Sequence, residues 1–117
     1  MNDPRQPLAT DDDVRRHVEH GLPHTPVLLT TGPQRDQPAE EAEAIQAAHL
    51  RYLVGLYQQG HLALNGPVQD QSGELRGVSL YRSPDVETVR ALAEADPAVR
   101  AGRLRARVLP WFGVLPD

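Results

Sequence analysis

The chain has 117 residues, enough for one domain with a single two-layer core. A net charge of -4 and a hydrophobic fraction of 39% are typical of a globular protein and exclude the basic surface that nucleic acid or an anionic membrane would need. Cysteine and lysine are absent, because all 12 basic residues are arginines, and this excludes disulfides, thiolate catalysis and a lysine Schiff base.

Residues 1–25 form a polar, acidic extension that contains one predicted helix. Thr10 is a good N-cap residue, acidic residues follow it, and Gly21 ends the helix. We expect this extension to be docked and yet to be dispensable for folding, because Val14 and Val18 are its only helix-face aliphatic residues, too few for a place in the main core. Deletion of residues 1–22 is therefore expected to leave the fold intact.

Three histidines near this helix have a spacing that can be read in two ways: His17, His20 and His24. Histidines three apart on a helix can share a metal ion. Neither cysteine nor a recognisable supporting shell accompanies them, so an accidental surface cluster is the preferred interpretation. We predict no metal and no cofactor.

No segment of the sequence is typical of secretion or of a membrane span. The N-terminal residues lack the apolar stretch of a signal peptide, and no apolar run approaches the roughly 18 residues of a transmembrane helix. We therefore predict a cytoplasmic protein.

Residues 26–117 are predicted to form one domain in which strands and helices alternate in a recognisable order. Strands are expected over 26–32, 61–66, 75–82 and 103–111, and helices over 39–59 and 84–96.

Local signals mark the ends of both predicted helices. Pro38 opens the first and Gly60 follows its end. Ser83 is the expected N-cap of the second, and Pro97 ends that helix at Asp96 because a residue before proline leaves the helical region.

This order of elements, βαββαβ, predicts a ferredoxin-like α+β fold. Such a fold has a four-stranded antiparallel sheet with both helices on one face. Its other face stays uncovered, and a partner subunit or a ligand usually fills it. We expect a homodimer formed by this face, with Trp111 near the interface as a packing residue rather than a substrate platform.

His49 and Asp96 can be a catalytic pair or two unrelated structural residues. His49 lies on the apolar stripe of the first helix, with Ile45, Tyr52 and Leu56, where it could act as an acid or base or simply be bonded within the core. Asp96 could bond nearby backbone amides at the helix end, or it could orient an imidazole. Sequence spacing alone does not decide between these interpretations.

Other polar residues are candidates for binding a small substrate: Ser79, Tyr81, Asn65 and Tyr52. Strand alternation places Ser79 and Tyr81 on one face, as a pocket wall or as ordinary interface residues. For Asn65, a tight turn before Gly66 is the simpler explanation. The alternating Arg103, Arg105 and Arg107 could bind an anion, but charges that protect an edge strand are the preferred interpretation.

Several stretches occur together in a recognisable order: "AAHLRYLVGLYQQGHLALNGPV", "LRGVSLYRSPDVETVRALAEADPAVRAGRL" and "VLPWF". In this combination the chain resembles the YCII-related (YciI-like) family over roughly Val27 to Phe112. The resemblance implies a ferredoxin-like subunit that dimerises as a dimeric α/β barrel, with a site built around His49 and Asp96.

Dehydrochlorination of a hydroxylated aromatic ring is one reaction represented in that family. The resemblance therefore implies a small cofactor-free enzyme that carries out acid/base elimination or isomerisation on a cyclic or aromatic metabolite. The alternative is a non-catalytic module that binds a small molecule or a partner protein through the same pocket. The extension before the first strand departs from the family pattern, and it could cover the mouth of the pocket or add to an interface.

Overall fold

An antiparallel sheet forms the centre of the computed structural model, which describes residues 8–70 and 72–114. The strands are β1 (Leu22–Thr31), β2 (Leu62–Pro67), β3 (Leu75–Tyr81), β4 (Leu104–Val108) and β5 (Trp111–Gly113). Their order is β2-β3-β1-β4, and β5 pairs with β1 outside this order. The predicted ferredoxin-like α+β fold is confirmed.

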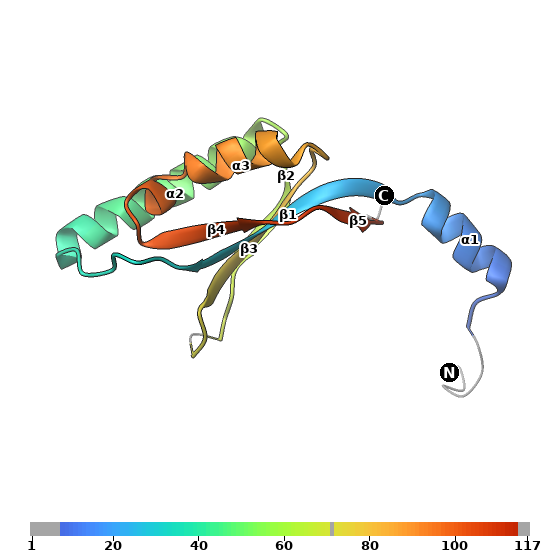
Figure 1. Cartoon of the computed structure of the whole chain (residues 1–117), viewed down its shortest axis with the longest axis horizontal. Coiled ribbons are helices and arrows are strands. Elements are labelled where there is room, and N and C mark those ends of the chain that lie inside the picture. Colours follow the sequence, from blue (N-terminus) through green and yellow to red (C-terminus); the bar gives the residue numbers. More distant parts are fainter. Residues whose placement is uncertain (1–7, 71, 115–117) are drawn as a thin grey trace.

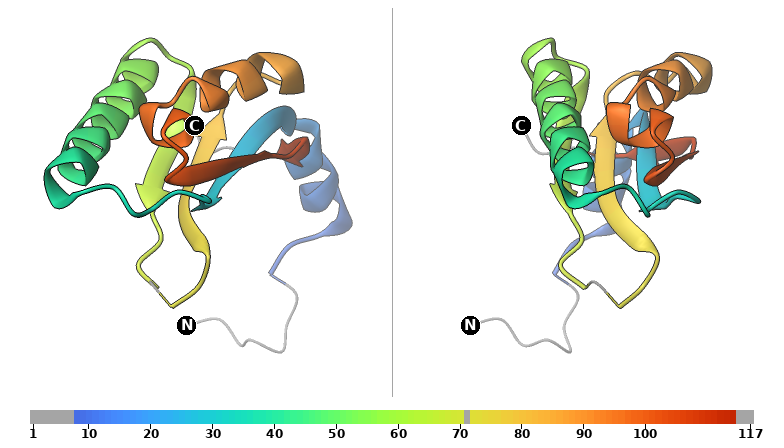
Figure 2. Two further views of the ribbon diagram at one scale, coloured as in Figure 1. Left: turned by 60° about the vertical axis from the view of Figure 1, so that its left-hand side comes forward. Right: turned by 90° about the vertical axis from the view of Figure 1, so that its left-hand side faces the viewer.

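The helices are α1 (Asp11–Glu19), α2 (Ala39–Gln58), α3 (Val86–Glu94) and α4 (Pro97–Arg100). Helix α2 and the α3–α4 segment cover the same face of the sheet, whereas α1 lies beyond its far end (Figures 1 and 2). None of the helices in the described part of the chain is both long enough and apolar enough to cross a membrane.

Helix α2 has the ends that the sequence predicts. It begins after Pro38, whose missing N–H costs nothing in the first turn, and Glu40 and Glu41 favour its N-terminus. Gly60 follows the C-cap with a φ of 84°, a left-handed conformation that glycine adopts without strain.

Helix α3 begins later than the sequence predicts. Asp85, not Ser83, is its N-cap: the Asp85 carboxylate accepts from the backbone N–H of Glu87. The Ser83 hydroxyl accepts instead from the N–H of Asp85, at 3.1 Å. Both side chains favour a helix start, and the carboxylate nearer the first turn takes the capping position.

The apolar core lies between the sheet and helices α2 and α3. Its buried members come from three strands, β1, β2 and β3, and from the two helices: Val27, Leu29, Leu56, Leu62, Tyr81, Val89 and Ala93. In β1, Val27 pairs with Val108 and Leu29 with Ala106, so alternate residues of neighbouring strands face the helices together.

The opposite face of the sheet has no helix over it in the described chain (Figure 2). Leu28 lies on this face between Val78 and Arg107, its partners in the two adjoining strands. Leu64 belongs to the same face and is 54% exposed. These residues form the surface on which dimerisation was predicted.

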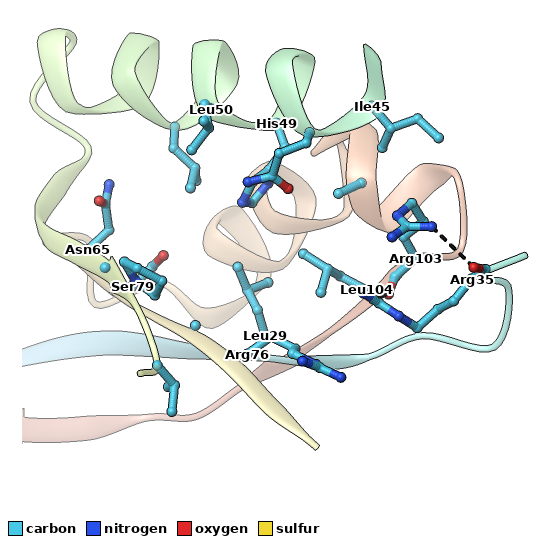
Figure 3. Close-up of a pocket in the computed structure, with 17 residues that line it drawn as sticks. Leu29, Arg35, Ile45, His49, Leu50, Asn65, Arg76, Ser79, Arg103 and Leu104 are labelled. Atoms are coloured by element: carbon cyan, nitrogen blue, oxygen red, sulfur yellow. Dashed lines mark hydrogen bonds between the residues drawn. The ribbon is translucent and has the colours of Figure 1, made fainter. Parts of the chain in front are cut away.

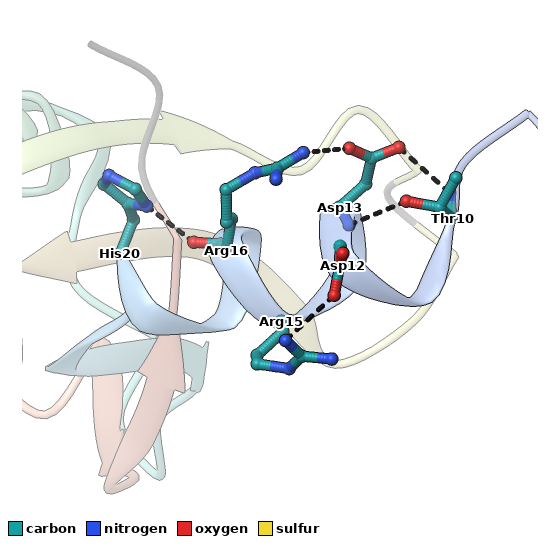
Figure 4. Close-up of polar contacts among 6 residues, drawn as sticks. All are labelled: Thr10, Asp12, Asp13, Arg15, Arg16 and His20. Carbon is teal, nitrogen blue, oxygen red and sulfur yellow. Dashed lines mark hydrogen bonds and ion pairs between the residues drawn. The ribbon is translucent and has the colours of Figure 1, made fainter.

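The N-terminal helix is held together by its own polar contacts, which Figure 4 shows. Thr10 and Asp13 form a capping box, as the N-cap prediction requires. Arg15 pairs with Asp12 at 2.9 Å, and Arg16 pairs with Asp13. No residue of α1 is buried, and Val14 and Val18 are 56% and 52% exposed, so α1 is not part of the core of this chain and its docking stays a prediction.

Strand β1 starts before the predicted boundary between residues 25 and 26. Its first residues pair with the C-terminal strand: Leu22 with Gly113, Pro23 with Phe112 and His24 with Trp111. The sequence could not reveal this start, because the partner that extends the strand lies at the other end of the chain.

Candidate active site

His49 and Asp96 lie in direct contact beneath the helices. The Nδ1 atom of His49 is 2.7 Å from Oδ2 of Asp96, and both residues are buried, with exposed fractions of 7% and 2%. His49 projects from the middle of α2, and Asp96 lies in the short connection between α3 and α4. The pair that sequence spacing left undecided is therefore present as a contact.

The position of Asp96 explains why a proline follows it. Pro97 cannot continue α3, but it fits the first position of the next helix, so Asp96 becomes the N-cap of α4 rather than the last residue of α3. Its Oδ1 accepts from the N–H of Ala98 at 2.9 Å, while Oδ2 faces His49. Asp96 thus makes a contact of each predicted kind, one with each oxygen.

His49 lines a pocket, and the other nitrogen of its imidazole is accessible. Nε2 of His49 has no hydrogen-bond partner in the described residues, and no buried side-chain nitrogen is left unsatisfied there, so Nε2 is accessible. The pocket is a cavity of about 530 Å³, within the range of roughly 300–1,000 Å³ that small-molecule sites occupy. Figure 3 shows His49 projecting from α2 above Leu29 and Leu104 on the sheet.

Asn65 and Ser79 line this pocket. They face each other across the β2–β3 pair, and a bulge at Ala63 makes this possible because the pairing skips from Leu62 to Leu64. Without the extra residue, alternation from the inward-facing Leu62 would turn Asn65 to the opposite face. The bulge therefore brings a side-chain amide to the wall that carries Ser79.

Tyr52 and Tyr81 are not among the lining residues, so these two candidates for substrate binding lie outside the pocket. The hydroxyl of Tyr52 donates to the carbonyl of Leu92 at 2.7 Å, so it fastens α2 to α3. Burial, together with the charge of Asp96, raises the pKa of Tyr52. Burial also raises the pKa of Tyr81, and the charges of Tyr52 and Asp96 raise it further. Both phenols therefore lie near the carboxylate and remain protonated at neutral pH.

Three arginines line the pocket: Arg35, Arg76 and Arg103. Only Arg103 is singled out from the sequence, and protection of an edge strand is preferred for it over anion binding. Arg35 lies in a loop that carried no motif, and Arg103 was assigned to an edge strand. Arg103 in fact precedes β4, whereas Arg105 and Arg107 lie in that strand and are exposed. Spacing offered no signal for the cluster, because the three residues come from different elements.

The remaining candidates lie outside the pocket. Trp111 is 49% exposed on β5, next to the start of β1. Nδ1 of His20 contacts the carbonyl of Arg16, and Nδ1 of the buried His24 contacts the carbonyl of Leu22. Within residues 8–70 and 72–114, no three histidine, aspartate or glutamate side chains are grouped as a metal site would need.

The sheet, the two covering helices and the pocket define a small ferredoxin-like α+β domain with a histidine–carboxylate pair at its cavity. The chain belongs to the YCII-related domain family, whose family model matches residues 27–112. The resemblance stated from the sequence motifs is thus confirmed. No curated protein sequence matches the chain.

Among solved structures, the chain is similar to 5-chloro-2-hydroxyhydroquinone dehydrochlorinase (TftG) from Burkholderia phenoliruptrix AC1100, in complex with 2,5-dihydroxybenzoquinone. The TM-score is 0.53 at 20% identity, covering 74% of this chain and 92% of that chain. Similarity at this level of identity shows a common fold.

Proposed function

We propose that the protein is a cofactor-free enzyme that catalyses acid/base elimination or isomerisation on a small cyclic or aromatic metabolite. The observation that carries the proposal is the 2.7 Å contact between Nδ1 of His49 and Oδ2 of Asp96. A carboxylate accepts only, so in the neutral imidazole the proton resides on Nδ1 and leaves Nε2 free to take a proton. His49 lines the cavity, and Nε2 is its accessible nitrogen.

The proposed role of Asp96 is that of a positioning residue. Its second oxygen is held by the N–H of Ala98, so the carboxylate keeps one orientation toward the imidazole. When Nε2 takes a proton from the substrate, the adjacent negative charge stabilises the imidazolium. The same imidazolium can then return the proton to another atom of the substrate.

Such a shuttle supports the reaction type of the similar dehydrochlorinase. Nε2 of His49 would take a proton from a ring hydroxyl and deliver it to the carbon that carries the leaving group. Removal of a second hydroxyl proton would then expel the leaving group with its bonding pair, so that one proton and one anion are released. Isomerisation would need only the first proton transfer and its reversal at another atom.

The polar wall opposite the helix suits a hydroxylated ring. Ser79 is buried and can both donate to and accept from a substrate oxygen, and the Asn65 amide lies beside it in the sheet. We propose that these two residues hold the ring oxygens while the aliphatic side chains of Leu29 and Leu104 contact the ring face. Assembly as a homodimer through the uncovered sheet face and a cytoplasmic location remain part of this proposal.

The proposal is tested with 5-chloro-2-hydroxyhydroquinone as the first substrate and chloride release as the assay, followed by a panel of hydroxylated rings and lactones. His49→Gln should lower turnover by about 10²- to 10⁴-fold, the usual contribution of a general acid or base. The matched control is His17→Gln, because His17 is exposed on α1. A wild-type protein that binds these compounds but turns over none of them would identify a binding module instead.

A further inference from the structure

Three arginines lie around one end of the pocket, and each comes from a different part of the chain. Arg35 follows β1, Arg76 belongs to β3, and Arg103 precedes β4. Figure 3 shows them at the end below Ile45, with Asn65 and Ser79 toward the other end and His49 between. The strands of one sheet thus bring together charges that are far apart in sequence.

No carboxylate compensates these charges in the described part of the chain. None of the three arginines forms an ion pair with an acidic side chain of residues 8–70 and 72–114. The lining of the pocket contains no aspartate or glutamate, although the whole chain has a net charge of -4. The cavity wall is therefore positive in a protein that is negative overall.

Neutral oxygen atoms hold the three guanidinium groups in place. Nη1 of Arg35 donates to the carbonyl of Arg103 at 2.6 Å, and Nη1 of Arg103 donates to Oε1 of Gln37 at 2.7 Å. Nε of Arg76 donates to the hydroxyl of Thr31 at 3.1 Å. Each guanidinium has five N–H donors, so these bonds orient the groups and leave most of their donors for a ligand.

The backbone beneath Arg35 and Arg103 is locked. Gly32 donates to the carbonyl of Arg103 at 2.8 Å, and Gln34 donates to that of Gly102 at 2.9 Å. A side chain on Gly32 would collide with the backbone of residues 102–104, so only glycine allows this approach. The two arginines are therefore carried on one rigid unit and need little reorganisation to bind.

A β-bulge in strand β3 places Arg76 on the face of the sheet that lines the pocket. Leu29 pairs with Gly77, but the next residue, Thr30, pairs with Leu75, so Arg76 is the extra residue in β3. Regular alternation from the inward-facing Gly77 would turn Arg76 to the other face. Bulges are frequent beside active sites, where they re-aim a side chain in this way.

The three charges also act on one another. Burial lowers the pKa of Arg35, and the neighbouring Arg103 and Arg76 lower it further. Like charges at close range destabilise each other, and a bound anion relieves that repulsion.

We infer that Arg35, Arg76 and Arg103 bind an oxyanion of the substrate, a carboxylate or a phosphate, at the end of the pocket away from Asn65. This inference rests on the proposed function and specifies its substrate class. The planar forks of guanidinium match the paired oxygens of such a group. His49 and the aliphatic side chains of Leu29 and Leu104 lie between the two polar ends of the pocket. The substrate is therefore a small cyclic acid whose reacting ring lies under Nε2 of His49.

The test compares small aromatic ligands that differ in charge: benzoate, phenyl phosphate and neutral benzamide, which has the shape of benzoate. Dissociation constants are measured by NMR titration of ¹⁵N-labelled protein, following the arginine Nε–H signals. Variants Arg35→Gln, Arg76→Gln and Arg103→Gln each remove one charge. Arg51→Gln is the matched control, because Arg51 is exposed on α2 and does not line the pocket.

We expect benzoate or phenyl phosphate to bind at least about tenfold more tightly than benzamide, as charge-assisted bonds from two or more guanidinium groups predict. The stronger of the two anions identifies the oxyanion. Each of the three variants should lose about tenfold in affinity for that anion, whereas Arg51→Gln should stay within about twofold of wild type. Arg35 is the most exposed of the three, so Arg35→Gln is informative even if another variant fails to fold.

Equal binding of the anions and benzamide would overturn the inference, as would arginine variants with unchanged affinity for the anions. Arginine variants that dissociate a dimer while affinity stays constant would assign the cluster to a contact with a second copy, and this too would overturn it. Because the assay measures binding and not turnover, a protein without turnover that shows arginine-dependent anion binding keeps this inference and loses only the proposed reaction.

Discussion

Replacing Asp96 by asparagine is expected to separate the two contacts that the carboxylate makes. The buried N–H of Ala98 needs an acceptor, so the amide oxygen of asparagine takes the place of Oδ1. The amide NH₂ then faces Nδ1 of His49, where Oδ2 stood at 2.7 Å. Two donors cannot pair, so Nδ1 must become an acceptor and the imidazole proton must move to Nε2. The variant keeps the fold but loses the free base at the cavity.

The size of the effect follows from the two bonds. Asp96→Asn keeps the N-cap and exchanges one hydrogen bond for another, so the free energy of unfolding should fall by only about 1 kcal/mol. Asp96→Ala removes the cap, at about 1 kcal/mol, and leaves the ring N–H without its partner, at about 1–3 kcal/mol more. A loss of about 2–4 kcal/mol is a large part of the roughly 5–15 kcal/mol that stabilises a domain.

Two measurements check this prediction. Urea unfolding compares wild type, Asp96→Asn and Asp96→Ala. The ¹⁵N chemical shifts of the His49 ring identify which nitrogen carries the proton, without any knowledge of the substrate. We expect the proton on Nδ1 in wild type and on Nε2 in Asp96→Asn, with a loss of turnover of about 10²-fold or more.

Two results would refute the reasoning. If the proton of the His49 ring stayed on Nδ1 in Asp96→Asn, the amide oxygen of the asparagine would face the ring. The N–H of Ala98 would then not determine the orientation of that amide. An asparagine variant with the changed tautomer and normal turnover would show that Nε2 of His49 is not the base.

Three further predictions concern the parts of the molecule around this pair. Deletion of residues 1–20 should change the free energy of unfolding by less than about 1 kcal/mol, because α1 has no buried residue. The deletion must stop before Leu22, which pairs with Gly113. Loss of folded protein would show that the extension belongs to the core. Burial raises the pKa of Tyr81, so the folded state holds the phenol proton more tightly than the unfolded chain; stability is retained below about pH 10 and falls above it. Since the chain has neither lysine nor cysteine, tyrosines alone titrate in that range, and urea unfolding of Tyr81→Phe should show a smaller alkaline loss than wild type. Sedimentation should give a dimer for wild type and a monomer for Leu64→Arg, because the variant puts a charge on the uncovered face of the sheet. A wild-type monomer of about 13 kDa at micromolar concentration would contradict the dimer.

Local sequence patterns predict the order of the main elements, βαββαβ, and the ends of α2, whereas α4 and the separate strand β5 appear only in the structure. Pro38 and Gly60 act through their own backbone geometry, so their effect does not depend on the rest of the fold. The motifs around His49 and Asp96 indicated the family, and with it the two residues that the fold joins. Local signals were less certain where two compete, as when Asp85 rather than Ser83 caps α3.

Which side chains face the pocket depends on how distant parts of the chain pack together. Strand alternation predicts facing only while the pairing is regular, and the bulges at Ala63 and Arg76 break it on β2 and β3. The position of a bulge depends on the partner strand, and for Arg76 that partner is β1, far back along the chain. Arg35 and Arg103 meet for a related reason, because backbone bonds join the segments after β1 and before β4. Contacts of this kind arise from packing between distant segments, and short-range sequence patterns carry no record of them.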